Sequence, residues 1–157
     1  MNDLQVNLEK LKKIPLFQKL SRNSLTTLLQ NSRVEGFEEN DLVFSEGQRG
    51  DRFFIVLDGG VRISRQIEGV GEKQLSVCRE NSYFGELAMI DNSPRSADAR
   101  AVESTKLLVV HKSKLEELMF ADNAFASEVL WVFVRHLSTR LRESNEKLRA
   151  AYQMDLM

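Results

Sequence analysis

Residue types that carry most metal and redox chemistry are scarce in this 157-residue chain, which has one cysteine and two histidines. A single cysteine, Cys78, excludes an internal disulfide, a cysteine-ligated iron–sulfur cluster and a Cys-rich zinc site. His111 and His136 lie in segments of different texture, so they offer no converging ligand set for a cupin-type metalloenzyme and no axial ligand for a haem sensor. We therefore expect neither a metal nor catalysis.

Two further absences narrow the class of protein. The net charge is only −1, so no basic excess draws the chain to nucleic acid. No apolar run reaches the length of a membrane span, and the polar N-terminus lacks the apolar stretch of a secretory signal. With 42% hydrophobic and 29% charged residues, we expect one soluble cytoplasmic domain that binds neither DNA nor membranes directly.

The texture of the sequence changes twice, and the first part is helical. Residues 1–32 form this N-terminal helical segment. Apolar positions Leu4, Leu8 and Leu11 indicate a short amphipathic helix, and Ser21 is expected to cap a second one.

Residues 33–112 have the texture of a β domain. Short runs rich in Val, Ile, Phe and Leu, such as 53–57 and 107–110, are separated by Gly, Asn and Asp turns. Asp58-Gly59-Gly60 is a strong turn signal between two of these runs. Many short strands at close spacing predict an antiparallel sandwich, jelly roll or barrel.

Residues 113–157 become helical again. Ser113 and Glu116 fit a capping box, and basic residues such as His136 and Arg140 are expected on a solvated face or in pairs with nearby glutamates. A heptad seam then alternates steps of four and three: Leu130, Val134, Leu137, Leu141, Ser144, Leu148 and Ala151. This seam predicts a long helix that pairs with a second copy as a dimer.

Residues 83–97 carry the strongest chemical signal. Gly85 would let a ligand approach the backbone at the start of a short helix, whose unpaired N–H groups attract anions. Glu86 offers acceptors for a sugar hydroxyl, while Arg95 and Ser96 offer donors that suit a phosphodiester. The spacing alone leaves open a plain surface salt bridge between Glu86 and Arg95.

This stretch closely resembles the phosphate-binding cassette of the cyclic nucleotide-binding domain family, through Phe84-Gly85-Glu86-Leu87-Ala88 and Arg95-Ser96-Ala97. The family includes bacterial catabolite activator proteins and the regulatory subunits of cyclic AMP-dependent protein kinase. Ile14–Phe17 and 46–63 extend the resemblance over nearly the whole chain. It implies one mainly β domain: an antiparallel jelly-roll (double-stranded β-helix) barrel with N-terminal helices and a long C-terminal helix.

The resemblance also implies roles for the cassette residues in a non-enzymatic receptor. Glu86 would accept from the ribose 2′-hydroxyl, and Arg95 and Ser96 would bind the cyclic phosphate. The implied ligand-binding set is Gly85, Glu86, Leu87, Ala88, Arg95, Ser96 and Ala97. Cyclic AMP is the expected ligand ahead of cyclic GMP, although the sequence does not decide between them.

Contacts to the base are assigned by alignment with the same family. Ile63, Leu75 and Cys78 are candidates on strands, where ordinary core packing is the alternative. Ser144 and Asn145 on the C-terminal helix are candidates for the adenine amino group, one from each subunit. The alternative for Ser144 is a polar residue that sets the register of the seam.

The sequence ends within the helical pattern, before the two helices of the helix-turn-helix that catabolite activators carry. We therefore expect a free-standing module, or a fragment of a catabolite activator-like transcription regulator, that signals through its C-terminal helix to an unidentified partner. A degenerate domain that only mediates protein association is the remaining alternative.

Overall fold

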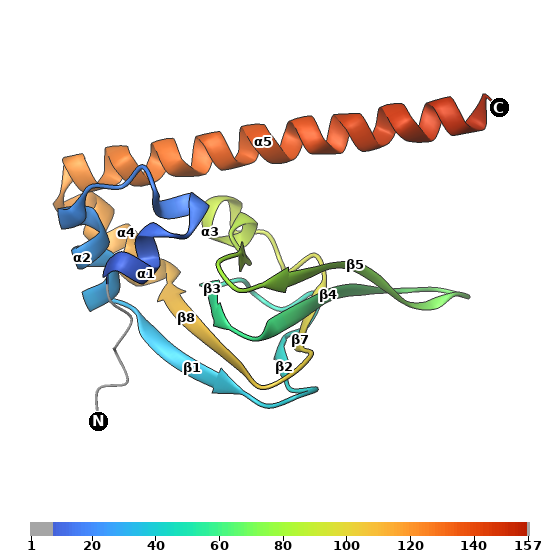
Figure 1. Ribbon diagram of the computed structural model, residues 1–157, viewed down its shortest axis with the longest axis horizontal. Helices are drawn as coiled ribbons and strands as arrows, with labels where there is room; N and C mark the ends of the chain where they lie inside the picture. The colour runs from blue at the N-terminus through green and yellow to red at the C-terminus, as the bar shows by residue number, and fades with distance from the viewer. Residues whose placement is uncertain (1–7, 157) are drawn as a thin grey trace.

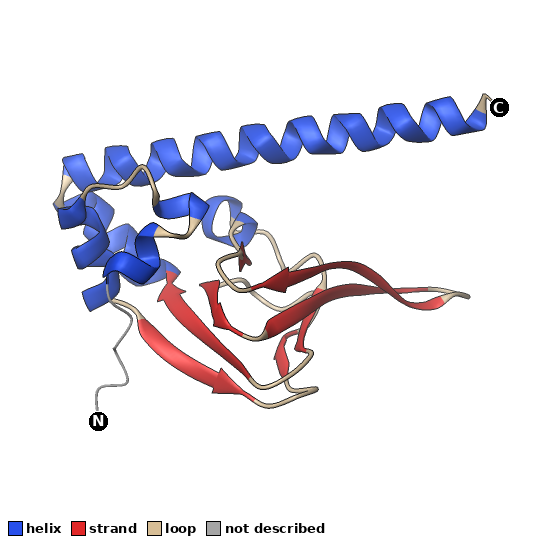
Figure 2. Ribbon diagram, in the orientation of Figure 1, coloured by secondary structure: helices blue, strands red, loops and turns tan. Residues whose placement is uncertain are grey.

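The computed structural model describes residues 8–156, apart from the side chains of residues 88 and 89. The expected helical position Leu4 lies outside the described residues. Within them, strands occupy the middle of the chain and helices flank it (Figures 1 and 2). The expected mainly β, antiparallel fold with flanking helices is confirmed.

Two four-stranded antiparallel sheets form the β domain. The first has the order β1-β8-β3-β6, with bounds Arg33–Phe37, Thr105–His111, Arg52–Asp58 and Tyr83–Phe84. The second has the order β2-β7-β4-β5, with bounds Leu42–Phe44, Asp98–Ala101, Gly60–Ile67 and Gly71–Arg79. Apart from the β4–β5 hairpin, sheet neighbours are not consecutive in sequence, as in a jelly roll.

The helices gather at one end of the barrel and along one side of it (Figure 1). Those at the end are α1 (Leu8–Lys12), the 3-10 helix η1 (Pro15–Phe17), α2 (Arg22–Gln30) and α4 (Lys112–Ala121). The short α3 (Leu87–Asp91) lies between the barrel and α5 (Asn123–Asp155). No helix among residues 8–156 is long and apolar enough to cross a membrane.

Strand β3 is buried on both faces, which explains its unbroken apolar run. Phe53, Ile55 and Leu57 pack with the helices in one core cluster. Phe54 and Val56 pack inside the barrel in a second cluster. Because side chains alternate along a strand, this one strand joins the helical layer to the barrel interior.

The two helix caps expected from sequence have different outcomes. Ser21 caps α2 as expected, because its side chain accepts from the Ser24 N–H at 3.2 Å. The capping box at Ser113 is wrong: α4 already begins at Lys112, directly after β8. The Lys112 N–H donates to the carbonyl of Asp51, the residue before β3, at 2.9 Å, and within the described residues no side chain caps this end of the helix.

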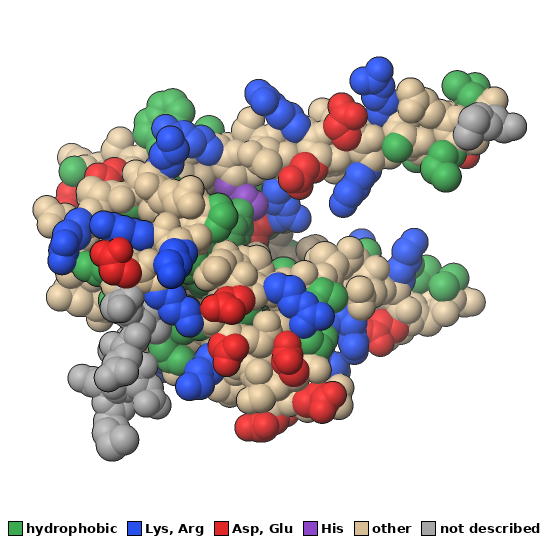
Figure 3. All heavy atoms as spheres, viewed as in Figure 1, with side chains coloured by type: hydrophobic (Ala, Val, Ile, Leu, Met, Phe, Trp, Pro, Cys, Tyr) green, Lys and Arg blue, Asp and Glu red, His purple; other side chains and the backbone are tan. Residues whose placement is uncertain are grey.

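Helix α5 is half docked and half projecting. Asp122 caps it by accepting from two backbone N–H groups, and Phe125, Val129 and Phe133 bury its first turns against the core. From Ser138 onward every described side chain is exposed. The outer half therefore extends past the barrel over the β4–β5 hairpin, with a deep notch between them (Figure 3).

Phe53→Ala tests the junction between helices and barrel. Phe53 is 2% exposed and meets Phe133 of α5 edge-on at 6.0 Å, so we expect the free energy of unfolding to fall by about 3–5 kcal/mol. Phe120→Ala is the matched control, since Phe120 is 89% exposed and should change stability by less than about 0.5 kcal/mol. Urea unfolding measures both, and equal losses would contradict the assignment.

Candidate functional site

A cavity of about 610 Å³ lies between the segment 83–97, the second sheet and α5. Its size falls within the range of small-molecule sites. The sheet contributes Phe44, Ile63, Ser76 and Cys78, and α5 contributes residues at helical spacing: His136, Thr139, Arg140 and Glu143. The cavity therefore has one wall that belongs to the barrel and one that belongs to the projecting helix.

Short-range geometry fixes the segment 83–97 over the cavity. Gly85 has a φ of +80°, which favours glycine, and turns the chain from β6 into α3. The segment then returns along the turn at 45–49, where the Arg95 N–H donates to the Gln48 carbonyl and the Gly47 N–H donates to the Arg95 carbonyl, both at 2.8 Å. These backbone bonds place the Arg95 side chain beneath Gly85.

Arg95 is a buried cation that contacts no carboxylate at ion-pair distance among the described residues; only 5% of it is exposed. Its Nη1 donates to the Gly85 carbonyl at 3.1 Å and its Nη2 to the Arg52 carbonyl at 2.6 Å. The guanidinium lies 4.2 Å from the centre of the Phe44 ring, and Arg95 Nε has no hydrogen-bond partner within the described part of the chain. Burial lowers the pKa of Arg95. An anion in the cavity would compensate this charge.

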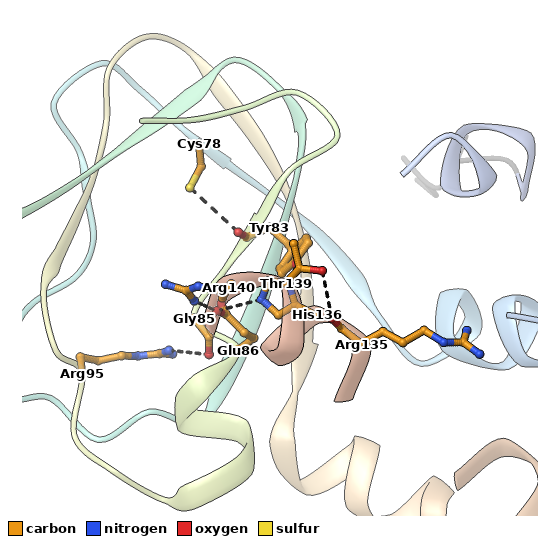
Figure 4. A network of polar contacts seen from close by, with 9 residues as sticks. All are labelled: Cys78, Tyr83, Gly85, Glu86, Arg95, Arg135, His136, Thr139 and Arg140. Atoms are coloured by element: carbon orange, nitrogen blue, oxygen red, sulfur yellow. Dashed lines mark hydrogen bonds and ion pairs between the residues drawn. The ribbon is translucent and has the colours of Figure 1, made fainter. Parts of the chain in front are cut away.

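Glu86 lies opposite and is also buried, at 3% exposure. Two side chains from α5 reach its Oε1 atom: His136 Nε2 at 3.3 Å, and Arg140 Nη1 in an ion pair (Figure 4). The simple surface salt bridge between Glu86 and Arg95 is therefore wrong, because both residues are buried and Glu86 is paired with α5. Glu86 therefore connects the segment 83–97 to α5 through polar contacts.

His136 is neutral at ordinary pH. Burial and the nearby Arg140 charge lower the pKa of His136 to about 4. Its ring meets the Tyr83 ring edge-on at 4.5 Å, and the Tyr83 hydroxyl is hydrogen-bonded to Nδ1. The side chain is thus held on both ring nitrogens.

The structure brings most of the predicted binding set to the cavity. Gly85, Glu86, Leu87, Arg95, Ser96 and Ala97 line it. Ala88 lies in α3, and its side chain is not among those described.

The base-contact candidates separate into two groups. Ile63 and Cys78 line the cavity, and burial raises the pKa of the Cys78 thiol. Leu75 does not line it and is 52% exposed; Ser76 takes this place, because successive β5 residues face opposite sides. Ser144 and Asn145 lie beyond the lining part of α5 and do not reach the cavity within one chain.

The α5 side of the site was not predicted from the sequence. His136 and Arg140 contact Glu86 and so are not on a purely solvated face. The available signal was their spacing of four with Thr139 and Glu143 on the same helix face. Tyr83 precedes the recognised motif and carried no signal of its own. The residues described hold no group of three or more metal-ligating side chains.

Comparison with known proteins finds a match between residues 34–122 and the family model described as the cyclic nucleotide-binding domain. A CRP-like cAMP-activated global transcriptional regulator from Mycobacterium tuberculosis is 29% identical over 85% of this chain and 58% of its own length. Human cGMP-dependent protein kinase 2 is 28% identical over 92% of this chain and 18% of its own length.

Solved structures agree with these matches. The catabolite activator protein of Thermus thermophilus superposes with a TM-score of 0.76 at 28% identity, over 85% of this chain and 61% of that protein. The chain thus spans less than two thirds of the length of these full regulators and kinases.

Gly85→Ala tests how closely Arg95 approaches the backbone. A Cβ at Gly85 would lie 2.8 Å from Arg95 Nη1, whereas Gly69, with a similar φ of +77°, has no atom within 4 Å of that position. Gly69→Ala should therefore cost only the left-handed strain, about 1–2 kcal/mol. Gly85→Ala should cost about 1.5–3 kcal/mol more, because the Arg95 hydrogen bonds are displaced. Urea unfolding measures both; equal losses would refute the close approach.

Proposed function

Because the chain belongs to the cyclic nucleotide-binding domain family, we propose that it is a non-enzymatic receptor whose ligand enters the cavity beneath residues 83–97. The observation that carries the proposal is Arg95, a buried guanidinium without a carboxylate partner among the described residues. A cyclic phosphate would supply the missing negative charge, with the Ser96 hydroxyl beside it.

The rest of the ligand follows from this anchor. Glu86, Ile63 and Cys78 line the cavity, and we infer that Glu86 accepts from the ribose 2′-hydroxyl while the base lies toward Ile63 and Cys78 on the sheet. We propose cyclic AMP ahead of cyclic GMP because the regulator from M. tuberculosis is described as cAMP-activated. The human relative is a cGMP-dependent kinase, so the choice between the two nucleotides is part of the test.

The proposed signal passes through α5. Glu86 is bound by His136 and Arg140 of this helix, so a ribose that takes up the same carboxylate must alter or share these contacts. Ligand can shift the position of α5 only by the difference between its affinities for the two helix positions. We infer that Glu86 provides this difference in affinity, because its carboxylate would bind both the ligand and the side chains of α5.

We further propose that α5 pairs with a second copy in a cytoplasmic homodimer. Large apolar side chains of the heptad seam are exposed along it: Leu130, Val134, Leu141 and Leu148. Pairing would also bring Ser144 and Asn145 of one copy toward the cavity of the other, where contact with the base is proposed. In a longer regulator, this dimer would transmit the signal to a separate output domain.

Arg95→Ala tests the anchor. Calorimetry with cyclic AMP and cyclic GMP should detect binding by the wild type and a loss of about 10- to 100-fold in the variant, because a charge-assisted hydrogen bond is removed. Arg65→Ala is the control: Arg65 is exposed, pairs with Glu46 and does not line the cavity. Undiminished binding by Arg95→Ala would reject the anchor. A wild type that dimerises but binds neither nucleotide would favour the association module.

Leu141→Lys tests the dimer. Leu141 is 63% exposed within one chain, and a charge placed in the seam should weaken pairing about 30-fold or more, through loss of about 2 kcal/mol of apolar burial. Leu156→Lys is the control, since Leu156 is 88% exposed and lies outside the heptad positions. Sedimentation equilibrium measures both; a wild type that stays monomeric at high concentration would exclude this dimer.

A further inference from the structure

Three side chains form a continuous line of contacts behind the proposed ribose site (Figure 4). The Tyr83 hydroxyl is hydrogen-bonded to Nδ1 of His136, and Nε2 of the same ring lies 3.3 Å from Glu86 Oε1. The Glu86 and His136 side chains are only 4% and 13% exposed, so water competes little for these bonds. The line joins β6 and the segment 83–97 to α5.

The chemistry of the line fixes where its protons are. An ionised carboxylate only accepts hydrogen bonds, so His136 Nε2 must carry the proton that faces Glu86. Burial and the Arg140 charge lower the pKa of His136 to about 4, so its ring is neutral and Nδ1 has no proton. The Tyr83 hydroxyl therefore donates to Nδ1. Tyr83 selects the tautomer that can hold Glu86.

The two contacts from α5 converge on one oxygen of Glu86. Both His136 Nε2 and Arg140 Nη1 bind Oε1, so neither uses Oε2. The Arg140 side chain is 50% exposed, whereas the His136 side chain is 13% exposed and is enclosed between Tyr83 and Glu86. His136 is thus the better constraint on the orientation of the carboxylate.

We propose that His136, oriented by Tyr83, is a positioning residue for ribose recognition: it holds Glu86 Oε1 so that Oε2 meets the ligand's 2′-hydroxyl. His136 thereby sets the preference for a ribose over a 2′-deoxyribose cyclic nucleotide. This inference rests on the proposed function, since it concerns the carboxylate assigned to the ribose.

The test compares cyclic AMP with 2′-deoxy cyclic AMP by calorimetry on the full chain. Wild type should prefer the ribonucleotide by about tenfold or more, because a buried carboxylate loses its hydroxyl partner with the deoxy ligand. His136→Ala should lower affinity for cyclic AMP about tenfold and leave affinity for 2′-deoxy cyclic AMP within about twofold. His136→Gln, whose amide can both donate and accept, should restore most of the preference.

Two further variants make the result specific. Tyr83→Phe keeps the ring and removes only the donated hydrogen bond, so it should lose part of the same preference. It also serves as the test if His136→Ala does not fold. Ser138→Ala, exposed on the same helix and outside the cavity lining, should behave as wild type.

Equal losses for both nucleotides in His136→Ala would overturn the inference, because a merely structural role weakens binding without regard to the 2′-hydroxyl. An unchanged preference in both His136→Ala and Tyr83→Phe would overturn it as well. If wild type binds cyclic AMP, these outcomes leave the proposed function intact. If wild type binds neither cyclic AMP nor cyclic GMP, the proposed function and this inference fail together.

Discussion

The alternation of side chains along β3 organises the whole molecule. Phe53 faces outward and meets Phe133 of α5, while Phe54 faces inward and stacks on Phe84 with ring centres 5.1 Å apart. Two consecutive residues therefore tie the strand to the long helix on one side and to the start of the segment 83–97 on the other. The carbonyl of Arg52, the residue immediately before them, accepts a hydrogen bond from Arg95 Nη2. The helix and the cavity are held in relation to each other by three adjacent residues of one strand.

The cavity contains two buried groups of opposite charge, Glu86 and Arg95, and they differ in whether an oppositely charged side chain pairs with them. The charge of Glu86 is compensated by Arg140 of α5, and neutral His136 adds a hydrogen bond, whereas Arg95 contacts carbonyl oxygens and an aromatic ring face. Burying a charge without a partner of opposite sign is costly, so such a site is a good receptor for a small anion. This asymmetry also explains the proposed division of labour: Arg95 supplies affinity for the phosphate, and Glu86 connects the ligand to the helix.

Much of this could be predicted from the sequence, for identifiable reasons. The β region and the long helix follow from periodicity, and Gly85, Glu86 and Arg95 follow from a long, specific motif that matches the family. What could not be predicted depends on how α5 docks. The pairing of His136 and Arg140 with Glu86 joins residues about fifty positions apart, and no local pattern encodes that crossing. The prediction for Leu75 is wrong for a smaller reason: the sequence does not fix which face of β5 each residue takes, and a shift of one residue reverses the face.

The geometry of α5 also gives it mechanical leverage. The helix has 33 residues, or roughly 50 Å at 1.5 Å per residue, and among the described residues Arg140 is the last α5 side chain with a hydrogen bond or ion pair to the segment 83–97. About 15 residues, or ~22 Å, of α5 continue beyond Arg140 as an arm whose described side chains are exposed within one chain. A tilt of only about 10° at Arg140 would then displace the tip by ~4 Å, close to the width of a side chain. In the proposed mechanism, a rearrangement at the Glu86 carboxylate would be enlarged by the length of this arm, without a rearrangement of the barrel.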